Sequence, residues 1–273
     1  MPDEVVRLLR CPICAASLHR DGGTLRCAAG HAYDLARHGY VSLLAGRAPA
    51  GDTAAMVADR ETFLAAGHYD WLRDLLADRA AGLTAPGCVV DAGAGTGFYL
   101  AAVLERIPGS GLALDCSAYA LRRAARAHPR IGAVRADLWR PLPVADGVAR
   151  LVLNVFAPRN GTEFCRILAP GGTLVTVTPG PAHLTELVDR LGLLRVDAQK
   201  QRRLADALPG WRQVTTSRHT ATLTLDHEGV AALAGMGPSA WHSDPERLAA
   251  GIAALPPETT VTAECDLTEW RPT

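Results

Sequence analysis

The sequence predicts an α/β fold, in which a doubly wound parallel sheet follows a small N-terminal segment with clustered cysteines. Two observations support this prediction. Segments typical of strands and of helices alternate between residues 88 and 178, as in sheets whose helices connect parallel strands. Near the start of the chain, four residues of metal-ligand type fall within twenty-one positions. We therefore expect two domains, over residues 1–46 and 47–273, the second with a helical lead-in over residues 47–84.

The first domain carries its ligand-type residues in the spacing Cys-x2-Cys-x12-Cys-x3-His, at Cys11, Cys14, Cys27 and His31. Three thiolates and one imidazole complete a tetrahedral shell, which predicts a structural zinc site that folds the segment. The sequence of residues 17–26 predicts a hairpin with its turn at Asp21-Gly22-Gly23. A hairpin between two ligand pairs is typical of a zinc ribbon. The spacing disfavours the alternative of unrelated core cysteines.

The second domain begins after a Pro/Gly linker over residues 47–52, where Asp52 or Thr53 can cap a helix. Helical periodicity from Ala54 to Leu83 is broken at Gly67. The predicted strands then cover residues 88–91, 111–115, 133–137, 148–154 and 173–178, with helices over 98–106, 118–127 and 162–168. Strands over residues 210–225 and 259–270 flank a helix over residues 228–236.

Composition limits the class of protein. The chain has 273 residues, of which 48% are hydrophobic and 5% aromatic, which excludes disordered and fibrous proteins. Its apolar runs are too short to span a membrane. The cysteines outside the metal motif are scattered and no signal peptide precedes Cys11, so we expect a cytoplasmic protein. The formal net charge is zero, so any contact with nucleic acid must use a local basic patch.

A glycine-rich loop follows the first predicted strand. It contains Asp91, Gly93, Gly95, Thr96 and Gly97. The dinucleotide-binding fingerprint would need glycine at position 98, which is Phe98. Asp-x-Gly-x-Gly-x-Gly instead resembles the S-adenosylmethionine loop of class I (Rossmann-like) methyltransferases. The alternative is that this glycine-rich segment is a tight turn that binds no ligand.

Two further carboxylates end the next strands. Asp115 is placed to accept hydrogen bonds from ribose hydroxyls, and Asp137 could accept one from an adenine amino group, because ligands of open α/β sheets bind at the carboxyl ends of the strands. Asp137 precedes Leu138-Trp139-Arg140 and could instead cap a helix or form a salt bridge.

The substrate side is predicted next to this edge. Asn154 could bind a base edge or simply end its strand, and Phe156 or Trp139 could stack on a base. The loop from Thr178 to Leu184 brings His183 to the same rim. Candidates for phosphate contacts are Arg37, Arg47 and Arg60. The alternative is that these isolated arginines are solvated surface residues.

Several motifs together resemble the RlmA/TlrB family of 23S rRNA guanine-N1 methyltransferases, and the resemblance extends from Cys11 to Trp270. The motifs are the Cys3His segment, Gly51 to Met56, Arg60, Phe63-Leu64, Ala66-Gly67-His68-Tyr69, Asp91 to Tyr99, and Thr178 to Leu184. Ala-Gly-His-Tyr and Thr-Pro-Gly-Pro-x-His-Leu are far more specific than the glycine loop alone.

The resemblance implies zinc on the Cys3His set and cofactor contacts from Tyr69, Gly95, Thr96 and His183. It also implies a homodimer whose zinc modules flank a cleft for hairpin 35, in domain II of 23S rRNA. The implied target is N1 of guanine 748 in preference to guanine 745, with resistance to macrolides of the tylosin and mycinamicin type as a consequence.

Two other functions stay open at this point. The chain could be a small-molecule methyltransferase with a purely structural zinc ribbon, or a non-catalytic protein that binds RNA or sequesters an antibiotic. A zinc-dependent oxidoreductase is disfavoured, because the metal shell is full and the glycine spacing differs. The sequence names no general base.

Overall fold

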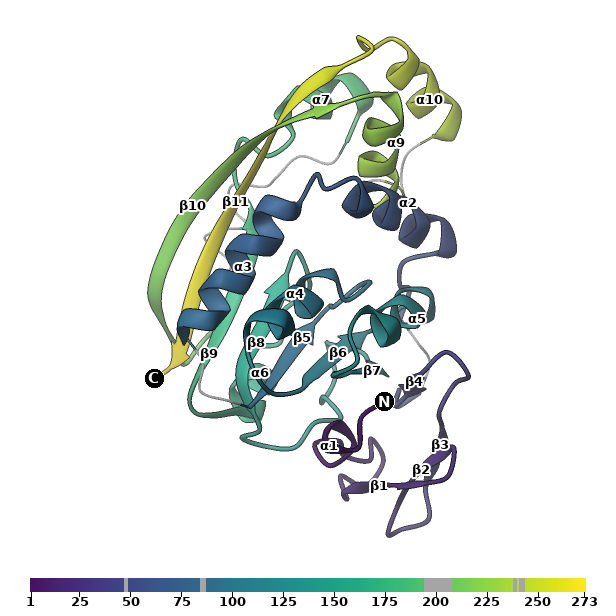
Figure 1. Cartoon of the computed structure of the whole chain (residues 1–273), viewed down its shortest axis with the longest axis vertical. Coiled ribbons are helices and arrows are strands. Elements are labelled where there is room, and N and C mark those ends of the chain that lie inside the picture. Colours follow the sequence, from purple (N-terminus) through teal and green to yellow (C-terminus); the bar gives the residue numbers. More distant parts are fainter. Residues whose placement is uncertain (47–48, 84–86, 194–207, 238–239, 241–243) are drawn as a thin grey trace.

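The computed structural model describes residues 1–46, 49–83, 87–193, 208–237, 240 and 244–273 (Figure 1). An eight-stranded sheet dominates it, in the order β10-β11-β9-β8-β5-β6-β7-β4. From one edge to the other, these strands are β10 (Trp211–Leu225), β11 (Thr259–Pro272), β9 (Leu168–Pro179), β8 (Ala149–Val155), β5 (Cys88–Ala92), β6 (Gly111–Asp115), β7 (Ile131–Arg135) and β4 (Tyr40–Ser42).

The sheet is parallel from β4 to β9, and β11 and β10 are antiparallel to their neighbours. The predicted parallel α/β sheet is therefore confirmed, with a long antiparallel extension at one edge. The crossover helices α4 (Phe98–Arg106) and α5 (Ala118–Ala127) have the predicted bounds. The helix α6 (Gly161–Ile167) is shifted by one residue from its predicted range of 162–168. Because strand and helix alternate, the carboxyl ends of the parallel strands meet at one edge of the sheet.

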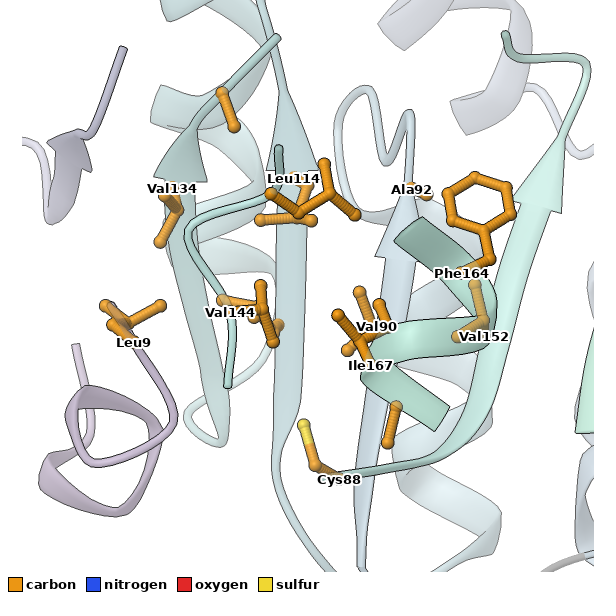
Figure 2. Close-up of a cluster of buried hydrophobic side chains, with 14 of the residues drawn as sticks. Leu9, Cys88, Val90, Ala92, Leu114, Val134, Val144, Val152, Phe164 and Ile167 are labelled. Atoms are coloured by element: carbon orange, nitrogen blue, oxygen red, sulfur yellow. The ribbon is translucent and has the colours of Figure 1, made fainter. Parts of the chain in front are cut away.

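Each face of the sheet carries its own hydrophobic core. Val89 on β5 packs in a cluster with residues of α3 (Asp70–Leu83), α4 and α5, among them Leu72 and Leu100. Val90 belongs to the core of the other face, together with Phe164 and Ile167 of α6 (Figure 2). Successive strand residues face opposite sides, so the near-continuous apolar run of β5 fills both cores.

The N-terminal module is joined to the sheet. Its ribbon consists of β1 (Leu18–Asp21), β2 (Thr24–Cys27) and β3 (Ala32–Asp34), which confirms the predicted hairpin. The following strand, β4, pairs in parallel with β7. Leu9 lies in the same buried cluster as Val134 and Val144 (Figure 2). The short helix α1 (Asp3–Val6) adds Val5 to this core, so the first 46 residues share a core with the sheet.

A helical layer covers the far end of the antiparallel extension (Figure 1). It contains α2 (Ala54–Ala65), α7 (Thr185–Leu191), α9 (His227–Gly235) and α10 (Pro245–Ala253). Phe63 of α2 and Val261 of β11 share its buried cluster. The break predicted at Gly67 separates α2 from α3, whereas α7 and α10 were not predicted. No helix within the described residues is long and apolar enough to cross a membrane.

Candidate functional site

The glycine loop leads from β5 to α4 at the carboxyl edge of the sheet. Its three glycines have positive φ angles of 90° at Gly93, 53° at Gly95 and 80° at Gly97. A Cβ on Gly93 would stand 2.3 Å from the Cβ of Ala157, and one on Gly97 would stand 3.0 Å from the Cα of Ala124. Only glycine fits both the backbone conformation and the space. The loop thus presents bare backbone, with Thr96 half-buried between the last two glycines.

Asp91 is a buried carboxylate without a hydrogen-bond partner among the described residues. It is 1% exposed, and neither of its oxygens is satisfied. Burial, and then the charge of Asp115, raises its pKa to about 8. A buried unpaired carboxylate costs free energy unless a cation or a donor meets it. The amino group of a methionine moiety lying on the glycine loop is such a partner, so Asp91 fits S-adenosylmethionine.

Asp115 ends β6 and braces the glycine loop. Its two carboxylate oxygens accept hydrogen bonds from the backbone N–H of Gly95, at 2.9 Å, and of Ser117, at 2.7 Å. Burial raises its pKa. A carboxylate oxygen can accept more than one hydrogen bond, so Asp115 retains acceptor capacity for ribose hydroxyls.

Three aromatic rings line the edge next to this loop. The ring of Tyr69, which is buried, lies 6.4 Å from that of Phe156, which in turn lies 6.0 Å from the ring of His183. Phe156 follows β8, is 40% exposed and has a φ of 51°, an unusual conformation for a bulky residue. Such strain is characteristic of functional sites. The structure therefore brings together three residues that the sequence predicted separately.

His183 is held as a neutral ring. Its Nδ1 accepts a hydrogen bond from the backbone N–H of Glu264 at 3.2 Å, which places the proton of the neutral imidazole on Nε2. Burial lowers its pKa to about 4. With Nδ1 engaged and Nε2 protonated, His183 is a hydrogen-bond donor in this arrangement and is not poised as a general base.

Asn154 is fully buried and its amide group is already used. Nδ2 donates to the carbonyls of Ala92 and Pro158, both at 2.9 Å. The side chain thus ties the end of β5 to the loop after β8. Of the two roles open in the sequence, this geometry favours the structural one over contact with a base edge, although its Oδ1 has no partner among the described residues.

Asp137 organises a turn. It accepts a hydrogen bond from the backbone N–H of Trp139 at 2.9 Å and lies 3.6 Å from Nε of Arg140. The sequence left a helix cap and a salt bridge open beside adenine binding. The structure has the salt bridge, but no helix follows Asp137, so its carboxylate caps a turn instead. The turn leaves Trp139 69% exposed. Asn160 Nδ2 donates to the carbonyl of Leu138 at 2.9 Å, which joins this turn to the loop after β8.

The candidate metal centre gathers the four predicted ligands, whose ligand atoms all lie within 4.8 Å of one another. Nδ1 of His31 is 3.5 Å from Sγ of Cys11 and 3.4 Å from Sγ of Cys27, and Sγ of Cys14 is 3.7 Å from that of Cys27. Sulfur atoms bound about 2.3 Å from one zinc ion stand about 3.8 Å apart at tetrahedral corners. The donor set therefore fits a closed zinc site.

Tight turns hold both ligand pairs. The backbone N–H of Ala15 donates to the carbonyl of Cys11 at 2.8 Å, and that of Gly30 donates to the carbonyl of Cys27 at 3.0 Å. Both turn residues have positive φ angles, of 58° at Ala15 and 86° at Gly30. The hydroxyl of Tyr33 lies 3.0 Å from Sγ of Cys11, as an outer partner of the ligand.

Comparisons with known proteins decide the family. The zinc-ribbon family described as RlmA, N-terminal, matches residues 9–47. A 23S rRNA (guanine(748)-N1)-methyltransferase of Streptomyces fradiae is 53% identical over all of this chain and 99% of its own length. A Micromonospora griseorubida protein named for 23S rRNA guanine-N1 methylation is 52% identical over both full lengths. The chain belongs to the RlmA/TlrB family of 23S rRNA (guanine-N1)-methyltransferases.

Solved structures agree on the fold. The methyltransferase complexed with the Trm112 activator of Haloferax volcanii aligns with a TM-score of 0.51 and 19% identity, over 81% of this chain and 98% of that one. YcgJ of Bacillus subtilis aligns with a TM-score of 0.50 and 13% identity, over 72% and 96%. These structures show the fold, and the family membership makes the chain an S-adenosylmethionine-dependent methyltransferase with a zinc ribbon.

The three arginines predicted for phosphate contacts lie in different surroundings in this RlmA/TlrB member. Arg60 pairs with Asp52 and donates to the carbonyl of Met236 at 2.8 Å, and its Nη1 would be 3.4 Å from a Cβ on Gly95. This position favours a role at the cofactor loop over one in contact with phosphate. Arg37 is exposed on the turn between β3 and β4. Arg47 lies outside the described residues.

Sequence reasoning missed Arg159. It follows Phe156 by three residues, is half-buried, and has no ion pair or hydrogen bond among the described residues. Burial lowers its pKa to about 10. The only sequence signal was its place shortly after the strand predicted over residues 148–154.

Proposed function

We propose that this protein transfers the methyl group of S-adenosylmethionine to N1 of guanine 748 in hairpin 35 of 23S rRNA. The observation that carries the proposal is the 53% identity, over essentially both full lengths, to the Streptomyces fradiae enzyme named for that guanine. The site supports it, since the glycine loop and the strained Phe156 lie at the same edge of the sheet.

Residues from several strands and loops would hold the cofactor. Gly93, Gly95, Thr96 and Gly97 offer backbone to its methionine and ribose portions, Asp91 meets its amino group, and Asp115 accepts from its ribose. Tyr69, Asp137 and His183 complete the proposed contacts. When bound, the cofactor supplies a sulfonium-activated methyl group for in-line displacement.

The target guanine would leave the hairpin loop and stack on Phe156, since chemistry on a base requires it to be unstacked. Methylation at N1 would require its proton to pass to solvent water, because His183 is not poised as a general base. A neutral His183 with its proton on Nε2 can donate a hydrogen bond to guanine O6, where charge accumulates as N1 loses its proton. Arg159, whose charge no described carboxylate balances, would stabilise the same charge or an adjacent phosphate.

The remaining parts of the proposal concern assembly and setting. The zinc module contributes to RNA recognition, two copies of the chain flank the hairpin as a homodimer, and the protein works in the cytoplasm on ribosomal RNA. Methylation of guanine 748 then protects the ribosome from macrolides of the tylosin and mycinamicin type.

Primer extension tests the activity directly. The protein is incubated with S-adenosylmethionine and unmodified 23S rRNA, and reverse transcriptase then copies the hairpin. N1 methylation blocks Watson-Crick pairing, so we expect a stop one nucleotide before position 748, absent without cofactor. A stop before position 745 would move the target by three nucleotides. Cofactor binding without any stop in the hairpin would favour a small-molecule methyltransferase, and no cofactor binding by calorimetry would favour a non-catalytic protein.

A further inference from the structure

Three guanidinium groups meet where the zinc module touches the sheet domain. Nε of Arg37, on the turn after β3, donates to Nε2 of His38 at 3.1 Å. Nη2 of Arg126, on α5, lies 3.1 Å from Nδ1 of the same ring. Arg122 stands one turn earlier on α5, four residues before Arg126 and on the same helix face. Burial and the charges of all three arginines lower the pKa of His38. We call these four residues the seam cluster.

The seam cluster has no carboxylate to balance it within the described part of the chain. None of its arginines forms an ion pair there, whereas Arg123 beside them pairs with Glu61 at 2.9 Å. Nε of Arg122 is buried without a hydrogen-bond partner. Since Nε2 of His38 accepts from Arg37, the proton of the neutral ring is on Nδ1, facing another donor on Arg126. Unpaired donors and like charges at this spacing are relieved by an anion with several acceptor oxygens.

An aromatic ring extends the cluster toward the cofactor loop. Tyr119 on α5 is 41% exposed, and the guanidinium of Arg122 lies 5.2 Å from its ring centre. The helix itself begins directly after Ser117, whose backbone donates to the cofactor-binding candidate Asp115. From Arg126 to Tyr119 the helix rises about 10 Å toward that carboxylate. Proteins that bind single-stranded or looped RNA combine cationic side chains, which contact the backbone, with exposed aromatic rings, which stack on bases.

We propose that the seam cluster, with Tyr119, binds backbone phosphates of the substrate RNA and thereby guides the strand from the zinc module to the cofactor loop. This proposal rests on the proposed function, because it takes ribosomal RNA as the substrate. Guanidinium forks match phosphate oxygens in pairs, and a chain whose net charge is zero needs such a local patch to hold RNA. Arg37 thereby keeps the phosphate role predicted from the sequence, now with two partners on α5.

The test measures RNA affinity against salt concentration. The double variant Arg37→Gln/Arg126→Gln and the single variant Arg37→Gln are compared with the full-length protein, using a labelled hairpin 35 RNA and fluorescence anisotropy from 50 to 300 mM KCl. Arg106→Gln is the control, because Arg106 is an exposed arginine of α4 that pairs with Asp78. Each lost phosphate contact reduces the slope of log Kd against log salt by about 0.7 to 0.9.

We expect the double variant to bind the hairpin at least tenfold more weakly in 100 mM KCl, with a slope reduced by about 1.5. The slope of the single variant should fall by about half as much. Affinity for S-adenosylmethionine by calorimetry should stay within twofold of the parent in all variants. An unchanged slope in the folded single variant, with the parent methylating RNA normally, overturns the seam cluster alone. A parent protein that neither binds nor methylates the hairpin overturns the proposed function as well.

Discussion

A Cβ on Gly93 would stand 2.3 Å from the Cβ of Ala157. The cofactor loop therefore touches the loop after β8, which also carries Phe156. Gly93→Ala must therefore displace the loop after β8, and it also places a side chain at a φ of 90°. We expect at least a tenfold loss of S-adenosylmethionine affinity by calorimetry and a larger loss of methylation. Gly82→Ala is the control, since a Cβ there meets nothing within 4 Å and should leave activity intact.

Asp91 should lose a proton when the cofactor binds. Its pKa of about 8 makes the free protein roughly nine-tenths protonated at this residue at pH 7, whereas the cationic cofactor favours the carboxylate. Calorimetry in buffers of different ionisation enthalpy should therefore report release of close to one proton. Asp91→Asn should abolish that release and weaken binding. Equal enthalpies in all buffers for the parent protein would contradict the assignment.

The same residue should make the free protein less stable at high pH. A carboxyl whose folded-state pKa is raised binds its proton more tightly in the folded state, so stability is full at low pH and falls as pH rises from about 4 through 8. Asp91→Asn removes this loss. We expect the difference in Tm between the variant and the parent, without cofactor, to grow between pH 6 and pH 9. A constant difference would show that Asp91 is not the titrating group.

Ala15 adopts a left-handed conformation that glycine adopts without strain. Ala15→Gly should stabilise the zinc module by about 1 kcal/mol, because it removes the clash of Cβ with the backbone at a φ of 58°. Competition with a chelator should show slower loss of zinc from the variant. Ala28→Gly provides the comparison, because Ala28 lies in the second turn, two residues before Gly30, without a positive φ, and the substitution should not stabilise the module. Faster zinc loss in Ala15→Gly would sink the argument.

Phe156 and Trp139 are both exposed aromatic rings, and the structure separates their roles. Phe156 contacts the rings of Tyr69 and His183, whereas Trp139 has no ring contact among the described residues. Stacking of a base on an aromatic ring contributes about 1–3 kcal/mol. We expect Phe156→Leu to reduce the single-turnover rate of methylation ten- to hundredfold without changing cofactor affinity, and Trp139→Leu to have a smaller effect. The reverse order would assign the target base to Trp139.

Most of the central fold could be predicted because local signals agree with it. The glycine loop sets the start of α4, and Ser117 caps α5, so both helices have the predicted bounds. The strand β4 could not be predicted, since Tyr40–Ser42 is too short for a recognisable period and exists through its pairing with β7. The antiparallel order of β11 and β10 likewise depends on contacts between distant segments.

The site shows the same division. Residues that act through backbone shape or position at a strand end, such as Gly93 and Asp115, could be found from the sequence. Side-chain partners could not, because Asn154 and Arg60 are defined by groups far away in the chain, at Ala92 and Met236. The seam cluster is of this kind as well, since it brings Arg37 to α5 across 85 or more positions.

The pairing of β4 with β7 connects zinc binding to the solubility of the protein. With β4 in place, the backbone of β7 is covered, and the exposed edge moves to a strand of only three residues. If loss of zinc released the ribbon and β4 with it, a longer and more apolar strand would offer its N–H and C=O groups to any neighbouring chain. Cells short of zinc would then accumulate aggregates of this protein rather than a soluble enzyme with weakened RNA binding.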